Sequence, residues 1–216
     1  CQPRNVNLIR ELAASPKPVV TVDFDIDNKP SINIDNEEAA YQVASHALSK
    51  GDSVAILGLR LIDSPATCRI YDSPLIDVET SIAHRRLDGY LSAAEDKNVV
   101  VTNEAIWHLP ESDRHFARQA AKEVLTSSPR PNVVLCMSDI IALELLHMAL
   151  EMDIKVPQEL KITGFDGIEE AERARPSLTT VCQSSSQKGV EAAKSLLDHV
   201  KSKNTLPFEV RLGETV

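Results

Sequence analysis

The chain has 216 residues, of which 43% are hydrophobic and 25% charged, so it is long enough for one large domain or two small lobes. Its net charge of −9 argues against nucleic-acid binding through this segment alone, because phosphate recognition needs a basic face. No apolar run has the length of a membrane span, and nothing resembles a signal peptide. Four cysteines without a CxxC motif indicate reduced thiols, so we expect a cytoplasmic protein without membrane contact.

Short apolar runs alternate with segments of helical length along the whole chain. We expect strands at 18–23, 30–34, 53–58, 98–102, 133–137, 161–165 and 208–212. We expect helices at 5–14, 35–49, 79–96, 111–127, 140–152 and 187–200. The segment 59–78 has no clear period, and 107–110 is interpreted as a loop. Such alternation predicts an α/β fold in which crossover helices connect the strands of parallel sheets.

The centre of this pattern is a strand-helix-strand unit. The runs 133–137 and 161–165 are apolar throughout, which is typical of strands buried on both faces. Ser138-Asp139 follows the first run, where a helix cap is needed, and GFDG follows the second. Ligands bind at this carboxyl edge of parallel sheets, so the polar residues there are candidates for a site.

The helix 140–152 is apolar except for one stripe, which consists of Glu144, His147 and Glu151. One face of a sheet cannot cover so much apolar surface. A two-fold copy of the same helix would cover the remainder. We therefore expect a homodimer through this helix.

The segment from Ser138 to Gln183 resembles the effector-binding domain of the LacI/GalR family of bacterial transcription regulators. The family pattern is Asn-Asp-x-x-Ala-x-Gly, then a helix, then apolar-Pro before a strand ending in Gly-(Phe/Tyr)-Asp, and later Pro-x-apolar-Thr-Thr-apolar-x-Gln. The chain matches it at Asp139, Ala142, Pro157, Gly164, Phe165, Asp166, Pro176, Leu178, Thr179, Thr180 and Gln183. It departs from the pattern at Ser138, where the family usually has Asn.

The resemblance implies a two-lobed, periplasmic-binding-protein-like fold of type I, with parallel sheets, a three-segment hinge and a ligand in the cleft. By this comparison 1–102 is an incomplete N-terminal lobe, 103–183 is the C-terminal lobe, and 184–216 is the hinge return with a terminal helix and strand. The segment 59–78 is longer than the family's loop and is interpreted as an insertion. No DNA-binding headpiece or counterpart of the first family strands is found, so the sequence is interpreted as a fragment.

The resemblance also implies ligand contacts for several side chains. Arg86 precedes Gly89-Tyr90 with the family's spacing, and Asp166 ends the strand of GFDG. Without the resemblance, Arg86 would be read as a solvated helix residue and Asp166 as a turn residue. Asp35 is equally compatible with a plain helix cap.

Four further candidates depend on the same comparison. Ser138 can still form hydrogen bonds, but it lacks the donor and acceptor of the usual amide, which points to a different effector. The family places a ring-stacking aromatic near 107–108: local alignment favours His108, and chemistry favours Trp107, the only Trp. Gln183 is a hinge-side candidate.

The sequence contains no GxSxG, GxxxxGK[ST] or GxGxxG motif, and its six histidines lack metal-ligand spacing. We therefore expect no enzyme activity, no cofactor and no metal. The expected function is that of a ligand-responsive repressor, with this chain binding a sugar-like or nucleoside-like effector and a missing headpiece binding operator DNA. A periplasmic sugar-binding protein is the main alternative, and a small-molecule enzyme using Ser138 is a weaker one.

Overall fold

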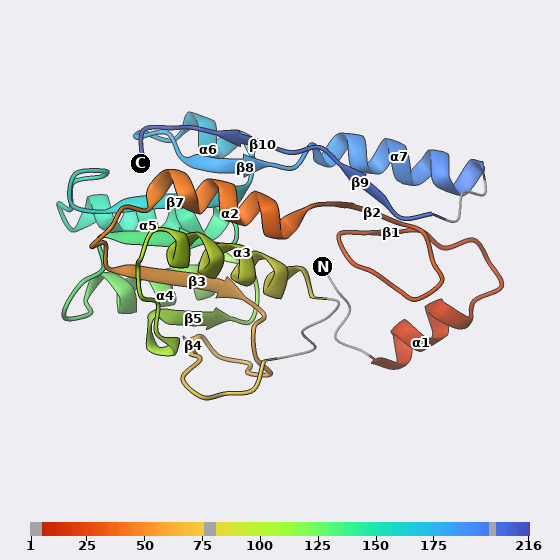
Figure 1. The fold of residues 1–216 in the computed structure, drawn as a ribbon, viewed down its shortest axis with the longest axis horizontal. Coiled ribbons are helices and arrows are strands. Elements are labelled where there is room, and N and C mark those ends of the chain that lie inside the picture. Colours follow the sequence, from red (N-terminus) through yellow and green to blue (C-terminus); the bar gives the residue numbers. More distant parts are fainter. Residues whose placement is uncertain (1–5, 76–80, 199–201) are drawn as a thin grey trace.

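A computed structural model describes residues 6–75, 81–198 and 202–216, and in it two sheets lie at opposite ends of the long axis (Figure 1). The larger sheet has seven strands in the order β10-β8-β7-β6-β3-β5-β4, and the smaller has the order β1-β2-β9. The strands are β1 (Thr21–Val22), β2 (Ser31–Ile34), β3 (Val54–Leu59), β4 (Cys68–Arg69), β5 (Ile106–Leu109), β6 (Val133–Cys136), β7 (Lys161–Asp166), β8 (Thr179–Cys182), β9 (Asn204–Leu206) and β10 (Glu209–Arg211).

The helices lie between the strands, as the alternating pattern predicts. They are α1 (Val6–Ala14), α2 (Asn36–Ala47), α3 (Ile82–Asp96), α4 (Arg114–Leu125), α5 (Asp139–Glu151), α6 (Glu169–Arg173) and α7 (Ser185–Leu197), with a 3-10 turn at Asn103–Ala105. The predicted positions 5, 76–80 and 199–200 lie outside the described residues. No helix in the described part of the chain is both long enough and apolar enough to cross a membrane.

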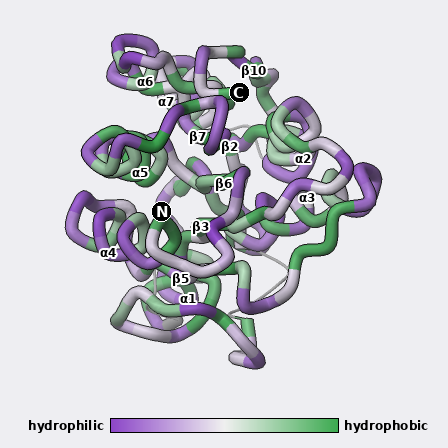
Figure 2. Tube along the Cα trace, turned by 90° about the vertical axis from the view of Figure 1, so that its left-hand side faces the viewer, coloured by the Kyte–Doolittle hydropathy of each residue, from purple (hydrophilic) through white to green (hydrophobic). Residues whose placement is uncertain are grey.

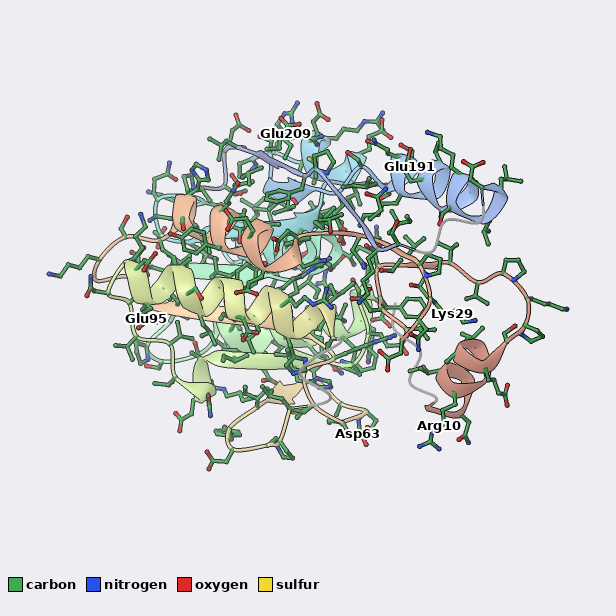
Figure 3. The ribbon with its side chains drawn as sticks, turned by 45° about the vertical axis from the view of Figure 1, so that its right-hand side comes forward. Arg10, Lys29, Asp63, Glu95, Glu191 and Glu209 are labelled. Atoms are coloured by element: carbon green, nitrogen blue, oxygen red, sulfur yellow. The ribbon has the colours of Figure 1, made fainter. Side chains whose placement is uncertain are left out.

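The central strands of the large sheet are parallel and buried on both faces, which confirms the prediction from their apolar runs. Alternate residues of β3 enter two different cores: Ile56 packs in the core beneath α2 and α3, and Leu57 packs in the core beneath α4 and α5. Figure 1 shows the same layering, with one helix pair on each face of the sheet. Exposed charged side chains such as those of Arg10, Asp63 and Glu95 project from the periphery (Figure 3).

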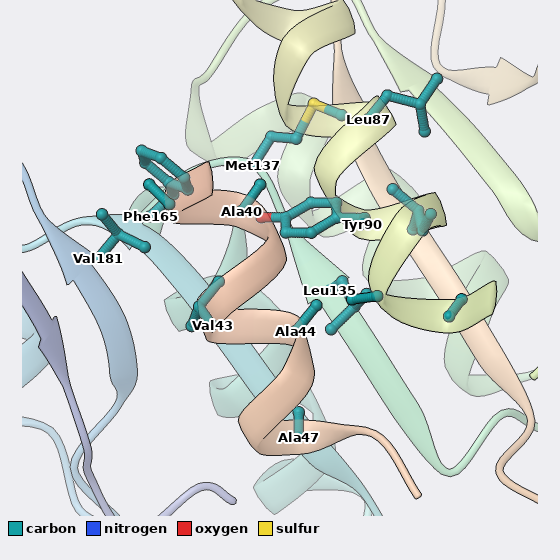
Figure 4. Close-up of a cluster of buried hydrophobic side chains, with 14 of the residues drawn as sticks. Ala40, Val43, Ala44, Ala47, Leu87, Tyr90, Leu135, Met137, Phe165 and Val181 are labelled. Carbon is teal, nitrogen blue, oxygen red and sulfur yellow. The ribbon is translucent and has the colours of Figure 1, made fainter. Parts of the chain in front are cut away.

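Small residues bring α2 and α3 into close contact. Ala40, Ala44 and Ala47 of α2 are buried in this layer, and Ala40 lies next to Tyr90 of α3 (Figure 4). A side chain at Gly89 is excluded, because a Cβ there would lie 2.2 Å from the carbonyl oxygen of Glu37. The approach of the two helices fixes the position of α3 above the sheet.

Helix α5 is apolar along most of its length, whereas α4 alternates hydrophilic and hydrophobic residues (Figure 2). Glu144 of the polar stripe is buried, and Arg114 and Arg118 of α4 hold its carboxylate at 3.5 and 3.4 Å. Ile140 and Leu150 remain exposed on the outer side of the helix. The unpartnered apolar surface is therefore narrower than the sequence pattern indicated.

Two further expectations differ from the structure. Residues 98–102 form no strand, and the strand that pairs with β3 on this side of the sheet is β5, which includes part of the predicted loop 107–110. The predicted lobe boundary after 102 does not separate the sheets, because β3 lies between β6 and β5 in the large sheet. Pairing with β3 explains both differences. Ile106–Leu109 align with β3 and so join the large sheet, whereas the apolar run at 99–101 has no such partner.

In the residues that the structure describes, the chain passes between the small and large sheets three times. These crossings connect β2 to α2, β8 to α7, and β9 to β10. Helix α7 packs against β1 and β2, so it belongs to the small lobe. Asp35 lies in the first crossing, and Gln183 lies in the second.

Candidate functional site

The carboxyl ends of β6, β7 and β8 lie side by side next to the crossings, because the three strands are parallel neighbours. Met137 and Ser138 follow β6, Asp166 ends β7, and Gln183 follows β8. The fold therefore brings three of the predicted site residues to one edge of the large sheet, where ligands bind in such folds.

Arg86 reaches this edge from α3, three residues before the contact of Gly89 with α2. Its Nε donates to Oδ1 of Asn36 at 3.0 Å, and its Nη1 donates to the carbonyl oxygen of Met137 at 2.6 Å. The guanidinium lies over the Phe165 ring, 3.6 Å from the centroid. The side chain is consequently buried and fixed, and it is not the solvated helix arginine of the alternative interpretation.

Asp166 faces Arg86, with its Oδ1 3.7 Å from Nη1 of the arginine. Burial raises the pKa of Asp166 to about 6, although the nearby Arg86 charge and a hydrogen bond from Gln183 act to lower it. The backbone has φ 122°, a conformation that a residue with a side chain rarely adopts. A strained, partly desolvated carboxylate beside a guanidinium is a combination typical of binding sites.

Gln183 connects Asp166 to the small lobe. Its Nε2 donates to Oδ1 of Asp166, and its Oε1 accepts from Nζ of Lys188 on α7. The same ammonium also donates to Asp23, which follows β1. Sequence reasoning missed Lys188 and Asp23. The available signal was a lysine at a helix position that shares one face with Ala192 and Ser195, where burial is expected.

A second polar contact joins the lobes. Arg85 of α3 donates to Asp25, which follows β1, at 2.8 Å, and Ser31 donates to the same carboxylate at 2.6 Å. Burial acts to raise the pKa of Asp25, but the hydrogen bonds from Ser31 and Arg85 outweigh it, and the pKa is lowered. Neither Asp25 nor Arg85 was predicted from the sequence.

Ser138 is buried at the sheet edge and is the N-cap of α5, where its Oγ accepts from the amide of Ile141 at 3.3 Å. The hydroxyl also contacts Oγ of Ser112 at 2.7 Å. Asp139 is not the cap. It is fully buried, accepts hydrogen bonds from Thr180 and the Ile168 amide, and has a pKa raised by burial.

Three of the predicted contacts are not brought to the Arg86–Asp166 pair. Asp35 is exposed and caps α2 by accepting from the amide of Glu38 at 3.0 Å, as the alternative interpretation expected. Trp107 is buried in the core beneath α4, where its indole donates to Glu123 at 2.9 Å. His108 is buried and accepts at Nδ1 from the amide of Leu61 at 3.1 Å, so it holds the loop after β3.

The site thus brings a guanidinium, a carboxylate and an amide together at the carboxyl edge of the large sheet, beside the second crossing. Such groups bind a polar molecule with both hydroxyl donors and acceptors. Within residues 6–75, 81–198 and 202–216, no group of three or more His, Cys, Asp or Glu side chains is arranged to hold a metal ion.

Comparisons with known proteins identify the family and the fold. Residues 68–216 match the family described as the periplasmic binding protein-like domain. The chain is 31% identical over 132 residues to the ribose operon repressor of Haemophilus influenzae, covering 59% of this chain and 38% of that protein. It is 34% identical over 127 residues to the transcriptional repressor PurR of Yersinia pestis, covering 59% of this chain and 37% of that one. Both relatives are named as repressors, and neither is named as an enzyme.

Solved structures share the fold. A LacI family transcriptional regulator from Enterococcus faecium, solved with bound ribose, has a TM-score of 0.77 at 21% identity. That match covers 98% of this chain and 76% of the other. The present chain therefore spans only part of the length of the proteins it matches.

Proposed function

Because the chain belongs to the periplasmic binding protein-like domain family, as an effector-binding domain of the LacI-family type, we propose that it senses a small polar effector for a ligand-responsive transcriptional repressor. The observation that supports this function best is the Arg86–Asp166 pair. Its two members come from α3 and β7 and lie 3.7 Å apart at the carboxyl edge of the large sheet, beside the second crossing. The proposed site of the effector lies between the lobes at this edge, and we call it, with Arg86, Asp166 and Gln183 on its large-lobe side, the effector cleft.

A sugar-like effector suits these groups. A hydroxyl can both donate a hydrogen bond to the Asp166 carboxylate, which only accepts, and accept one from the Arg86 guanidinium, which only donates. The ribose in the Enterococcus faecium structure and the name of the Haemophilus influenzae relative support this class for the proposal. Nucleosides carry ribose hydroxyls as well, so they are candidate effectors too.

The effector acts by changing the relation of the two lobes. A ligand that contacts Arg86 and Asp166 on one side and the small lobe on the other favours the closed arrangement by its differential affinity for that state. In the complete regulator, closure alters the spacing of two DNA-binding headpieces, which lie outside this chain and contact the operator half-sites. The protein acts in the cytoplasm as a dimer, and the exposed side of α5 favours this assembly over a monomeric periplasmic sugar-binding protein.

A thermal-shift screen of the full-length protein against sugars, nucleosides and sugar phosphates tests the proposal. A compound that raises the melting temperature is then titrated against Arg86→Ala and Asp166→Ala. Each substitution is expected to weaken binding by about 1–3 kcal/mol, because a buried polar partner is left unpaired. Asp35→Ala is the control, since its side chain only caps α2. The site assignment is wrong if the control loses as much affinity as the other two, and the function is wrong if no compound of these classes binds.

A further inference from the structure

Lys188 is 1% exposed although it carries a charge. Its ammonium donates to Asp23 in the small lobe and to the carbonyl oxygen of the Gln183 side chain in the second crossing. Removing an ammonium from water is costly unless it is paired and hydrogen-bonded. A lysine at this position therefore needs both partners, and only one of them is charged.

The partners of Gln183 determine how its amide is oriented. Lysine has no acceptor, so the atom of Gln183 that faces Lys188 must be Oε1. This leaves Nε2 facing Asp166, as found in the structure. Asp166 then has a donor on this side and the Arg86 guanidinium on the other. Both neighbours favour the carboxylate as an acceptor.

We propose that Lys188 is a positioning residue of the effector cleft: by orienting the Gln183 amide, it keeps Asp166 in the acceptor state that an effector hydroxyl requires. The inference rests on the proposed function only where it assigns the effector to Asp166. The order Asp23, Lys188, Gln183, Asp166 and Arg86 forms one hydrogen-bonded and ion-paired series from the small lobe to the large lobe.

The series also couples ligand binding to the small lobe. A hydroxyl that donates to Oδ1 of Asp166 competes there with Nε2 of Gln183, which donates to the same oxygen. Once the Gln183 amide is displaced from Asp166, its oxygen is free to turn away from Lys188. Asp23 is then the remaining partner of the Lys188 ammonium. Occupancy of the cleft thereby changes a contact of α7, the helix that packs on β1 and β2.

A purely structural role for Lys188, as the partner of Asp23, predicts a different response of Asp166. The charged groups that influence Asp166 are Arg86 on α3, Asp139 on α5 and Asp23 after β1, and Lys188 on α7 reaches it through the Gln183 amide. If Lys188 orients Gln183, its removal takes away a nearby positive charge and frees the amide to present oxygen, so the pKa of Asp166 rises above about 6. If Lys188 only supports packing, its loss admits water, and the pKa falls toward the ordinary value.

The experiment is a carboxyl-carbon NMR titration of the chain labelled with 13C at its aspartate side chains, without effector. Asp166→Asn identifies the resonance. In Lys188→Met the Asp166 pKa is expected to rise by about half a unit or more, and Lys188→Arg, which keeps the charge and the donors, is expected to restore most of it. Lys194→Met is the control on the same helix: its ammonium is exposed and pairs with Glu191, a residue labelled on α7 in Figure 3, so Asp166 should not respond.

Asp23→Asn provides a further contrast, since removing that negative charge lowers the Asp166 pKa, opposite to the effect of Lys188→Met. Lys188→Gln keeps a donor for Asp23 and replaces Lys188→Met if the latter does not fold; the same rise is expected. An unchanged or lowered Asp166 pKa in the folded variant overturns the proposal. Because no effector is present, a failed effector screen would remove the proposed function without affecting this result.

Discussion

The chemistry of a guanidinium explains why the site has an arginine at position 86. Its planar group lies flat on the Phe165 ring while its nitrogen atoms donate in the plane to Asn36 and to the Met137 carbonyl oxygen. A lysine could supply the charge but neither the stacking nor two donors in fixed directions. Arg86 is therefore held by the core, so that its remaining donor capacity is directed at Asp166 and the cleft.

The raised pKa of Asp166 predicts a pH dependence of stability. Its folded-state pKa of about 6 lies above the ordinary value of 3.8, so the folded protein binds a proton more readily than the unfolded chain between these values. The ionised carboxylate thus destabilises the fold above about pH 6, and stability from this residue increases as the pH falls. Asp166→Asn lacks this titration.

Urea unfolding of both proteins at about pH 7, pH 6 and pH 5 measures the effect. Wild type should gain stability relative to Asp166→Asn as the pH falls, because contributions from the other groups cancel in the difference. A difference that stays constant over this range, or that changes in the opposite sense, would contradict the assignment.

At the scale of elements, the contact between α2 and α3 positions Arg86. Gly89 allows the helices to approach, and Arg86 lies one turn earlier on α3, beside Asn36 at the start of α2. Asn36 itself is buried and donates to the carbonyl oxygen of Ile34. One close helix contact therefore connects core packing to the geometry of the site.

Gly89→Ala should destabilise the protein by about 1–3 kcal/mol, the usual cost of adding a methyl group to a well-packed core. The new Cβ would lie 2.2 Å from the Glu37 carbonyl oxygen and 2.9 Å from Cβ of Ala40. Gly189→Ala is the matched control, since it has nothing within 4 Å on α7. It should be neutral or stabilising by up to about 1 kcal/mol. Equal effects of the two substitutions in urea unfolding would refute the packing argument.

Elements with strong local signals could be predicted from the sequence. The strands at 133–137 and 161–165 are apolar enough to be identified without knowledge of their neighbours. The sequence alone does not show which of the runs at 99–101 and 106–109 forms a strand, because this depends on which one aligns with β3. Trp107 was misplaced for a related reason: the alternation along β5 directs its side chain to the α4 layer.

The site was predictable only where a family pattern covers it. Arg86, Asp166 and Gln183 lie in such patterns, and the structure brings them together. Lys188 and Asp23 acquire their role from the return of α7 to the small lobe, 165 residues after Asp23 in the chain. No local pattern encodes that proximity, so a sequence without an alignment does not reveal it.

At the scale of the whole molecule, the described residues connect the two lobes by chain crossings, by polar contacts and by a shared apolar core. The Arg85–Asp25 ion pair joins α3 to the small lobe directly, and the series through Gln183 and Lys188 joins it near the hinge. These charged groups are largely buried, so a ligand that displaces one partner must supply a replacement hydrogen bond or charge. Apolar residues also join the lobes, because Ile32 of β2 and Leu206 of β9 belong to the same buried core as Phe165 of β7.

The outer side of α5 carries the last prediction, which concerns assembly. Ile140 and Leu150 are 37% and 41% exposed, and Leu143 between them is partly buried. The large sheet and α4 cover the rest of the helix, so this side has no partner among the described residues. A two-fold copy would bury the same side chains on both molecules, because an isologous contact uses one self-complementary surface.

Sedimentation at about micromolar concentration should therefore give a dimer, with or without effector. Leu150→Glu should yield monomers, because the two-fold axis places the new charge in the contact twice and a buried, unpaired carboxylate is strongly unfavourable. Val100→Glu is the control: Val100 is 85% exposed beyond the C-terminal end of α3, so the mass should not change. A monomeric wild-type protein, or a dimer that tolerates Leu150→Glu as well as Val100→Glu, would show that α5 does not form the interface. If the dimer forms through α5, its contact lies on the large lobe, and the small lobes remain free to move relative to it when the cleft closes.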